Sequence, residues 1–78
     1  MKPIPIIKGT QLIKILERYG CRTLRTKGSH VRVECRHGKK TTIPVHAGKE
    51  LPKGLLRKIL YDDLELSEEQ VKEIFEIR

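Results

Sequence analysis

The chain has 78 residues, 37% of them hydrophobic and 35% charged, so it can build one small domain but not a large multi-lobed enzyme. Its 17 Lys and Arg against 10 Asp and Glu give a net charge of +7. No apolar run approaches the roughly 18 residues of a membrane span, and residues 1–8 lack the apolar core of a signal peptide, so we expect a cytoplasmic protein.

The first predicted element is a helix over residues 9–19. Its apolar residues recur at the spacing of one helical face, and they are Leu12, Ile13, Ile15, Leu16 and Tyr19. Gly20 follows directly and is expected to end the helix.

Three strands are predicted next, over residues 21–26, 31–36 and 41–45, with breaks at residues 27–29 and 37–39. The short connections indicate antiparallel hairpins. Pro44 has no backbone N–H to donate, so it favours an edge position or a strand end. We therefore predict a three-stranded antiparallel sheet.

Two further helices are predicted in the C-terminal part. Pro52 suits the first turn of a helix, whose buried stripe is Leu55, Leu56, Ile59 and Leu60. Ser67 and Gln70 have the spacing of a capping box, which opens a short helix over residues 67–77 carrying Val71, Ile74, Phe75 and Ile77. The prediction is a single α+β domain over residues 1–78: helix, three-stranded antiparallel sheet, helix and a short C-terminal helix, with one sheet face open.

The two cysteines have no CxxC spacing and no paired histidines, so neither a zinc site nor a redox motif is expected. If Leu24 shares the core face with Val31 and Val33, strand alternation puts Cys35 on that face and Cys21 on the other. A bulge in the hairpin would reverse this parity and allow a Cys21–Cys35 disulfide.

Motifs for nucleotide triphosphatases, zinc proteases and α/β-hydrolases are absent from the sequence. Asp62, Asp63 and Glu65 follow a helix end and are interpreted as a solvated acidic turn instead of a metal site. We expect no metal and no cofactor.

Three histidines remain as candidates for chemistry, because imidazole is the only side chain whose ordinary pKa lies close to neutral pH. His37 precedes a glycine and is interpreted as an exposed turn residue, while His46 could brace the loop after the third strand. His30 opens the second strand. Strand alternation places it with Arg32 on the open face, opposite the valines.

The surroundings of His30 are rich in positive charge, with Arg25, Lys27 and Arg32 nearby and Lys39 and Lys40 further away. These cations could hold phosphates. RNA supplies its own nucleophile in the 2′-OH, so a histidine base and neutralising cations would suffice for strand cleavage without metal. A phosphate-contacting or purely structural role for His30 is the alternative.

Charge is divided along the chain: residues 1–60 carry fifteen basic and three acidic side chains, whereas residues 61–78 carry two and seven. A basic body of this kind is typical of a nucleic-acid partner. The alternative is a thermally robust protein with surface ion pairs, but residues 1–60 hold too few acids to pair the bases.

Four segments together resemble the HicA-type (YcfA-like) mRNA interferase toxins. They are residues 9–12 (GTQL), 25–30 (RTKGSH), 43–51 (IPVHAGKEL) and 53–60 (KGLLRKIL), and the likeness covers residues 9–66. The resemblance implies a fold like that of double-stranded-RNA-binding domains, metal-independent mRNA cleavage with His30 as the catalytic residue, and silencing by a HicB-type antitoxin. Cys21, where the family often has an aromatic residue, and the added C-terminal helix depart from the pattern.

Two functions follow from this interpretation. The first is an endoribonuclease toxin with His30 as general base and RNA contacts from Arg25, Lys27, Gly28, Ser29, Arg32, Lys39 and Lys40. The second is a non-catalytic RNA-binding module that uses the same basic surface. A titratable histidine on this surface favours the nuclease.

Overall fold

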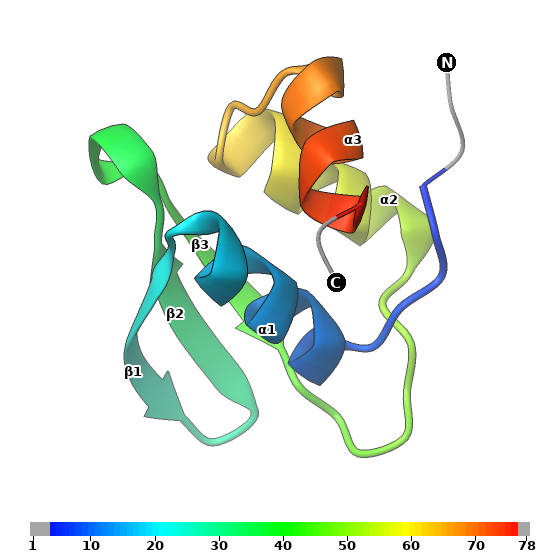
Figure 1. Cartoon of the computed structure of the whole chain (residues 1–78). Coiled ribbons are helices and arrows are strands. Elements are labelled where there is room, and N and C mark those ends of the chain that lie inside the picture. Colours follow the sequence, from blue (N-terminus) through cyan, green and yellow to red (C-terminus); the bar gives the residue numbers. More distant parts are fainter. Residues whose placement is uncertain (1–3, 77–78) are drawn as a thin grey trace.

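The structure is a computed structural model that describes residues 4–76. Its elements are α1 (Gly9–Tyr19), β1 (Arg22–Lys27), β2 (His30–Glu34), the short turn η1 (Arg36–Gly38), β3 (Lys40–Pro44), α2 (Lys53–Arg57), the wide helical turn η2 (Lys58–Asp63) and α3 (Glu68–Glu76). The three strands form one antiparallel sheet in the order β1-β2-β3 (Figure 1). The predicted α+β fold is confirmed. No helix among residues 4–76 is long and apolar enough to cross a membrane.

Helix α1 has the predicted bounds. Leu12, Leu16 and Tyr19 form its buried stripe, and the backbone N–H of Lys8 donates to Oε1 of Gln11 at 2.8 Å at the N-terminal end. Gly20 ends the helix with a left-handed φ of 113°, a conformation that costs glycine little because it has no Cβ.

The sheet buries one face under the helices. Val31 and Val33 on β2 and Thr41 and Ile43 on β3 are buried, and the residues that alternate with them are half-buried or exposed. Helix α1 contacts both β1 and β3, and η2 contacts β3. The opposite face therefore stays open, as predicted.

Strand β1 contains a bulge that determines which face of the sheet Cys21 occupies. Thr23 pairs with Val33 and Arg25 with Arg32, so Leu24 is an extra residue without a partner. Leu24 is 40% exposed, so the condition that it shares the core face with the valines is not met.

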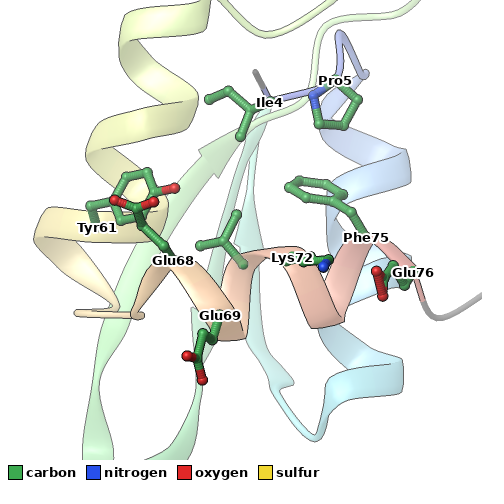
Figure 2. Close-up of a pocket in the computed structure, with 9 residues that line it drawn as sticks. Ile4, Pro5, Tyr61, Glu68, Glu69, Lys72, Phe75 and Glu76 are labelled. Atoms are coloured by element: carbon green, nitrogen blue, oxygen red, sulfur yellow. The ribbon is translucent and has the colours of Figure 1, made fainter. Parts of the chain in front are cut away.

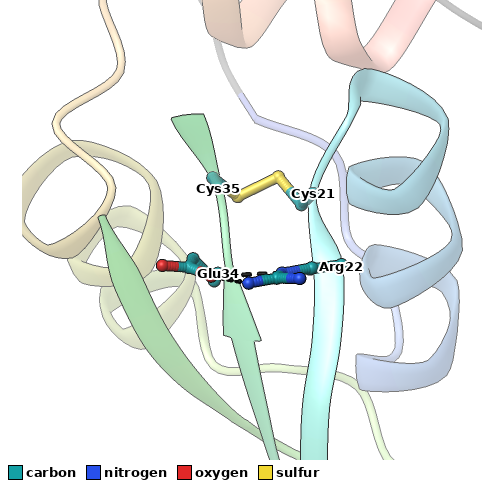
Figure 3. The surroundings of a disulfide bond; sticks show 4 residues. All are labelled: Cys21, Arg22, Glu34 and Cys35. Carbon is teal, nitrogen blue, oxygen red and sulfur yellow. Dashed lines mark hydrogen bonds and ion pairs between the residues drawn. A yellow bond between two sulfur atoms is a disulfide. The ribbon is translucent and has the colours of Figure 1, made fainter. Parts of the chain in front are cut away.

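Because one extra residue reverses the alternation, Cys21 turns to the same face as Cys35. The two cysteines are buried and joined by a disulfide, with their Cα atoms 4.1 Å apart (Figure 3). Next to the disulfide, Arg22 and Glu34 form an ion pair of 2.9 Å across the same two strands. Of the two arrangements that the sequence left open, the one with a bulge and a Cys21–Cys35 disulfide is therefore confirmed.

The C-terminal elements pack on the same core as α1, with η2 against β3 and α3 against α1. Leu56, Ile59 and Leu60 are buried, and the N–H of Leu64 donates to the carbonyl of Ile59 at 3.0 Å, which widens the turn η2. Leu55 is only half-buried.

The capping box predicted for the last helix is confirmed. The N–H of Gln70 donates to Oγ of Ser67 at 3.1 Å, and the N–H of Ser67 donates to Oε1 of Gln70 at 2.9 Å. Val71 and Ile74 are buried, and α3 packs against α1. Helix α3 reaches Glu76, the last described residue, and the predicted apolar residue Ile77 lies outside the described residues.

Candidate functional site

The turn between β1 and β2 places His30 at one end of the sheet. Gly28 has a φ of 59° in this turn, and His30 pairs with Lys27 on one side and with Pro44 on the other. The carbonyl of Ser29 accepts the N–H of Val45 at 2.6 Å, which ties the turn to the end of β3. His30 is exposed on the open face, as strand alternation predicts.

Around His30 lies a surface that we call the basic face, consisting of Arg25, Lys27, His30, Arg32 and Thr42. These five residues line a shallow depression of about 140 Å³. Nη1 of Arg32 donates to Oγ1 of Thr42 at 2.9 Å, so the guanidinium is held by its neighbour on β3. Its remaining N–H groups are available to an anion.

The basic face carries a high density of positive charge. Arg25 and Arg32 lie directly opposite each other on adjacent strands, an arrangement in which like charges repel. Among residues 4–76, no carboxylate forms an ion pair with Arg25, Lys27 or Arg32. An anionic ligand such as a phosphate would relieve this repulsion.

The other predicted RNA contacts lie elsewhere. Lys40 is opposite Glu34, about 14 Å along β3 from Pro44 at roughly 3.4 Å per residue. Lys39 precedes β3 and forms a 2.8 Å ion pair with Glu65. The structure thus brings Arg25, Lys27, His30 and Arg32 together and keeps Lys39 and Lys40 at the far end of the sheet.

Thr42 is a member of the basic face that the sequence interpretation missed. The signal was available, because Thr42 alternates with the buried residues Thr41 and Ile43 along β3 and so must share the face of Arg32. Threonine carries no charge and Thr42 belongs to none of the motifs quoted above, so neither charge nor motif pointed to it.

The two remaining histidines lie outside the depression. His37 has a φ of 62° in the turn η1 and is exposed, which confirms the turn interpretation. His46 is exposed in the loop after β3, where its backbone carbonyl accepts the N–H of Lys49 at 3.0 Å.

The acidic turn is only partly as expected. Asp62 and Glu65 are exposed, but Asp63 accepts hydrogen bonds from Oγ1 of Thr41 at 2.9 Å and from Nζ of Lys58 at 3.1 Å. Burial alone would raise the pKa of Asp63, but these two hydrogen bonds and the charges of Lys58 and Arg32 lower it below its usual value. Its interpretation as a solvated residue was therefore wrong. Within the described part of the chain, no three His, Cys, Asp or Glu side chains are grouped to hold a metal ion.

Comparison with protein-family models gives a match over most of the chain. The model of the family described as "HicA toxin of bacterial toxin-antitoxin" matches residues 9–66, which is more than half of the chain. No curated protein and no solved structure matches. The matched segment runs from the start of α1 past the end of η2, so it includes the whole basic face and leaves out α3.

Proposed function

This chain belongs to the HicA toxin family of bacterial toxin–antitoxin systems, and from that premise we propose that it is a metal-independent endoribonuclease that cleaves mRNA with His30 as the general base. The observation that supports this proposal most directly is the exposed imidazole within a depression whose Arg25, Lys27 and Arg32 form no ion pair with a carboxylate of residues 4–76. A base and a phosphate-binding surface then lie side by side.

In the proposed reaction, the neutral ring of His30 takes the proton of the 2′-OH as its oxygen attacks the adjacent phosphorus. The O2′–P bond forms and the P–O5′ bond breaks. The departing O5′ takes a proton from the imidazolium or from water, so the products end in a 2′,3′-cyclic phosphate and a 5′-OH. The reaction therefore requires no oxidant, reductant or cofactor.

The neighbouring cations would stabilise the negative charge that builds up on the phosphorane oxygens. Arg32 suits this role best because its hydrogen bond to Thr42 fixes the guanidinium in advance. Arg25 and Lys27 are exposed on the edge strand β1 and would bind the flanking phosphates. Gly28 and Ser29 shape the turn that presents His30, and an RNA chain would reach Lys40 and Lys39 only by running along the strands.

We further propose that the antitoxin partner is of the HicB type and presents acidic side chains to the basic face. Acidic groups would mimic phosphates there, speed association and fix orientation. Such a partner would bury His30 and so block the reaction.

A toxin that cleaves mRNA is expected to act in the cytoplasm. Thiols are usually kept reduced in that compartment, so the buried Cys21–Cys35 disulfide is unusual for the proposed location. The resistance of this disulfide to cellular reductants can be measured directly.

The test of the proposal is RNA cleavage by purified protein in the presence of a chelator. Wild-type protein should cleave RNA and leave cyclic phosphate ends, and His30→Ala should reduce the rate by about 10²–10⁴-fold. His46→Ala, which removes an exposed imidazole outside the depression, is the matched control and should retain full activity. Equal rates for wild type and His30→Ala would refute the general-base role.

Non-catalytic RNA binding is the second candidate, because Arg25, Lys27 and Arg32 would bind phosphates equally well without a histidine. In that case RNA would bind to the wild-type protein, and no cyclic phosphate ends would form at any protein concentration.

A further inference from the structure

A cavity away from the basic face lies along α3. It has a volume of about 380 Å³. Its wall comes from three segments, the N-terminal residues Ile4 and Pro5, Tyr61 on η2, and one side of α3 (Figure 2). We call it the α3 groove.

The floor of the α3 groove is apolar. Ile4 and Val71 are buried by their neighbours, and Tyr61 and Phe75 are half-buried and present the rest of their rings to the opening. Partly exposed aromatic rings in a concave surface are typical anchors for a protein partner.

The rim of the α3 groove is acidic. Glu68, Glu69 and Glu76 lie along the α3 side of the opening, and Lys72 is the single base among the lining residues. Across α3 the sequence EEQVKEIFE holds four Glu and one Lys, in a protein whose net charge is +7. An RNA chain or an anionic lipid surface would be repelled here.

From the apolar floor and the acidic rim we propose that the α3 groove binds a basic amphipathic helix of a partner protein. The apolar stripe of such a helix would fill the floor, and its Lys or Arg side chains would pair with the glutamates of the rim. From Glu68 to Glu76 the groove runs about 12 Å along α3, which corresponds to about two turns of a partner helix. This proposal does not depend on the nuclease function, because α3 packs against α1 in the helix layer (Figure 1), whereas His30 is exposed on the open face of the sheet.

The proposal is tested by titrating the isotope-labelled full chain, carrying His30→Ala so that it can be produced alone, with three synthetic peptides of about 18 residues. The first is a Leu/Lys peptide whose leucines form one apolar stripe along a helix. The second keeps this stripe and has Glu in place of every Lys. The third has the composition of the first, but its leucines are scattered and form no stripe. The first should bind about 10-fold more tightly than either control and should shift the amide signals of α3 and of Ile4.

Charge variants on exposed positions keep the test independent of folding. Glu68→Lys and Glu69→Lys should each weaken binding of the first peptide about 10-fold, and Glu73→Lys should leave it unchanged because Glu73 has the same charge on the same helix but does not line the groove. Equal binding of the three peptides, equal effects of Glu69→Lys and Glu73→Lys, or amide shifts on another surface would each overturn the proposal.

Discussion

Breaking the Cys21–Cys35 disulfide should strongly lower the thermal stability of the protein. The two cysteines are 14 positions apart, and cross-linking a loop of about 15 residues destabilises the unfolded chain by about 3 kcal/mol. For a domain of this size, each kcal/mol changes the melting temperature by about 4–8 °C. The expected decrease is therefore about 12–24 °C.

Thermal melts followed by circular dichroism, with and without reductant, measure this change. The double variant Cys21→Ala/Cys35→Ala serves as the control, because it should melt near the reduced wild type and should not respond to reductant. RNA cleavage at a temperature where both forms are folded should be retained, since Cys35 lies about 17 Å along β2 from His30 at roughly 3.4 Å per residue.

Two results would refute this reasoning. The first is a melting temperature that stays the same after complete reduction, which is checked by thiol labelling. It would show that the cross-link does not restrict the conformations of the unfolded chain. Loss of cleavage in reduced but folded protein would show that the disulfide also positions the site at the other end of the hairpin.

Three further predictions follow from particular contacts. Chemical denaturation should show that Gly9→Ala destabilises the protein by about 1–3 kcal/mol, because the added Cβ would collide with a backbone carbonyl oxygen of β3. In the same assay the control Gly54→Ala should be neutral or stabilising, because nothing lies near its added Cβ. Because the pKa of Asp63 is lowered in the folded protein, its contribution to stability is present above its usual pKa and lost as the pH falls through the lowered one. Unfolding measured between about pH 5 and pH 2 should therefore show a smaller loss for Asp63→Asn than for wild type. For binding of single-stranded RNA, Lys27→Ala should make the slope of the logarithm of the binding constant against the logarithm of the salt concentration shallower by about 0.7. Lys39→Ala should change this slope less, because Lys39 is ion-paired. Equal slopes for the two variants would contradict this difference.

The amino-acid sequence determines the local elements of this protein. The bounds of α1, the left-handed Gly20 after it and the Ser67–Gln70 capping box are all as predicted, because each depends on residues within a few positions of one another. The open-face position of His30 beside Arg32 is also predicted correctly, since strand alternation is a local rule. The same rule could have identified Thr42.

Features that depend on pairing between distant segments were decided only by the tertiary structure. The bulge at Leu24 is a property of the register between β1 and β2, and a single extra residue reverses which side chains face the core. The disulfide follows from that reversal and could not be derived from the alternation of either strand alone. Likewise, Lys39 forms an ion pair with Glu65, 26 positions further along the chain. The α3 groove exists only because Ile4, Tyr61 and Phe75 meet across three segments. Short-range patterns fix helices and strand faces, whereas charge pairing and cavities depend on which distant residues the packed core brings together.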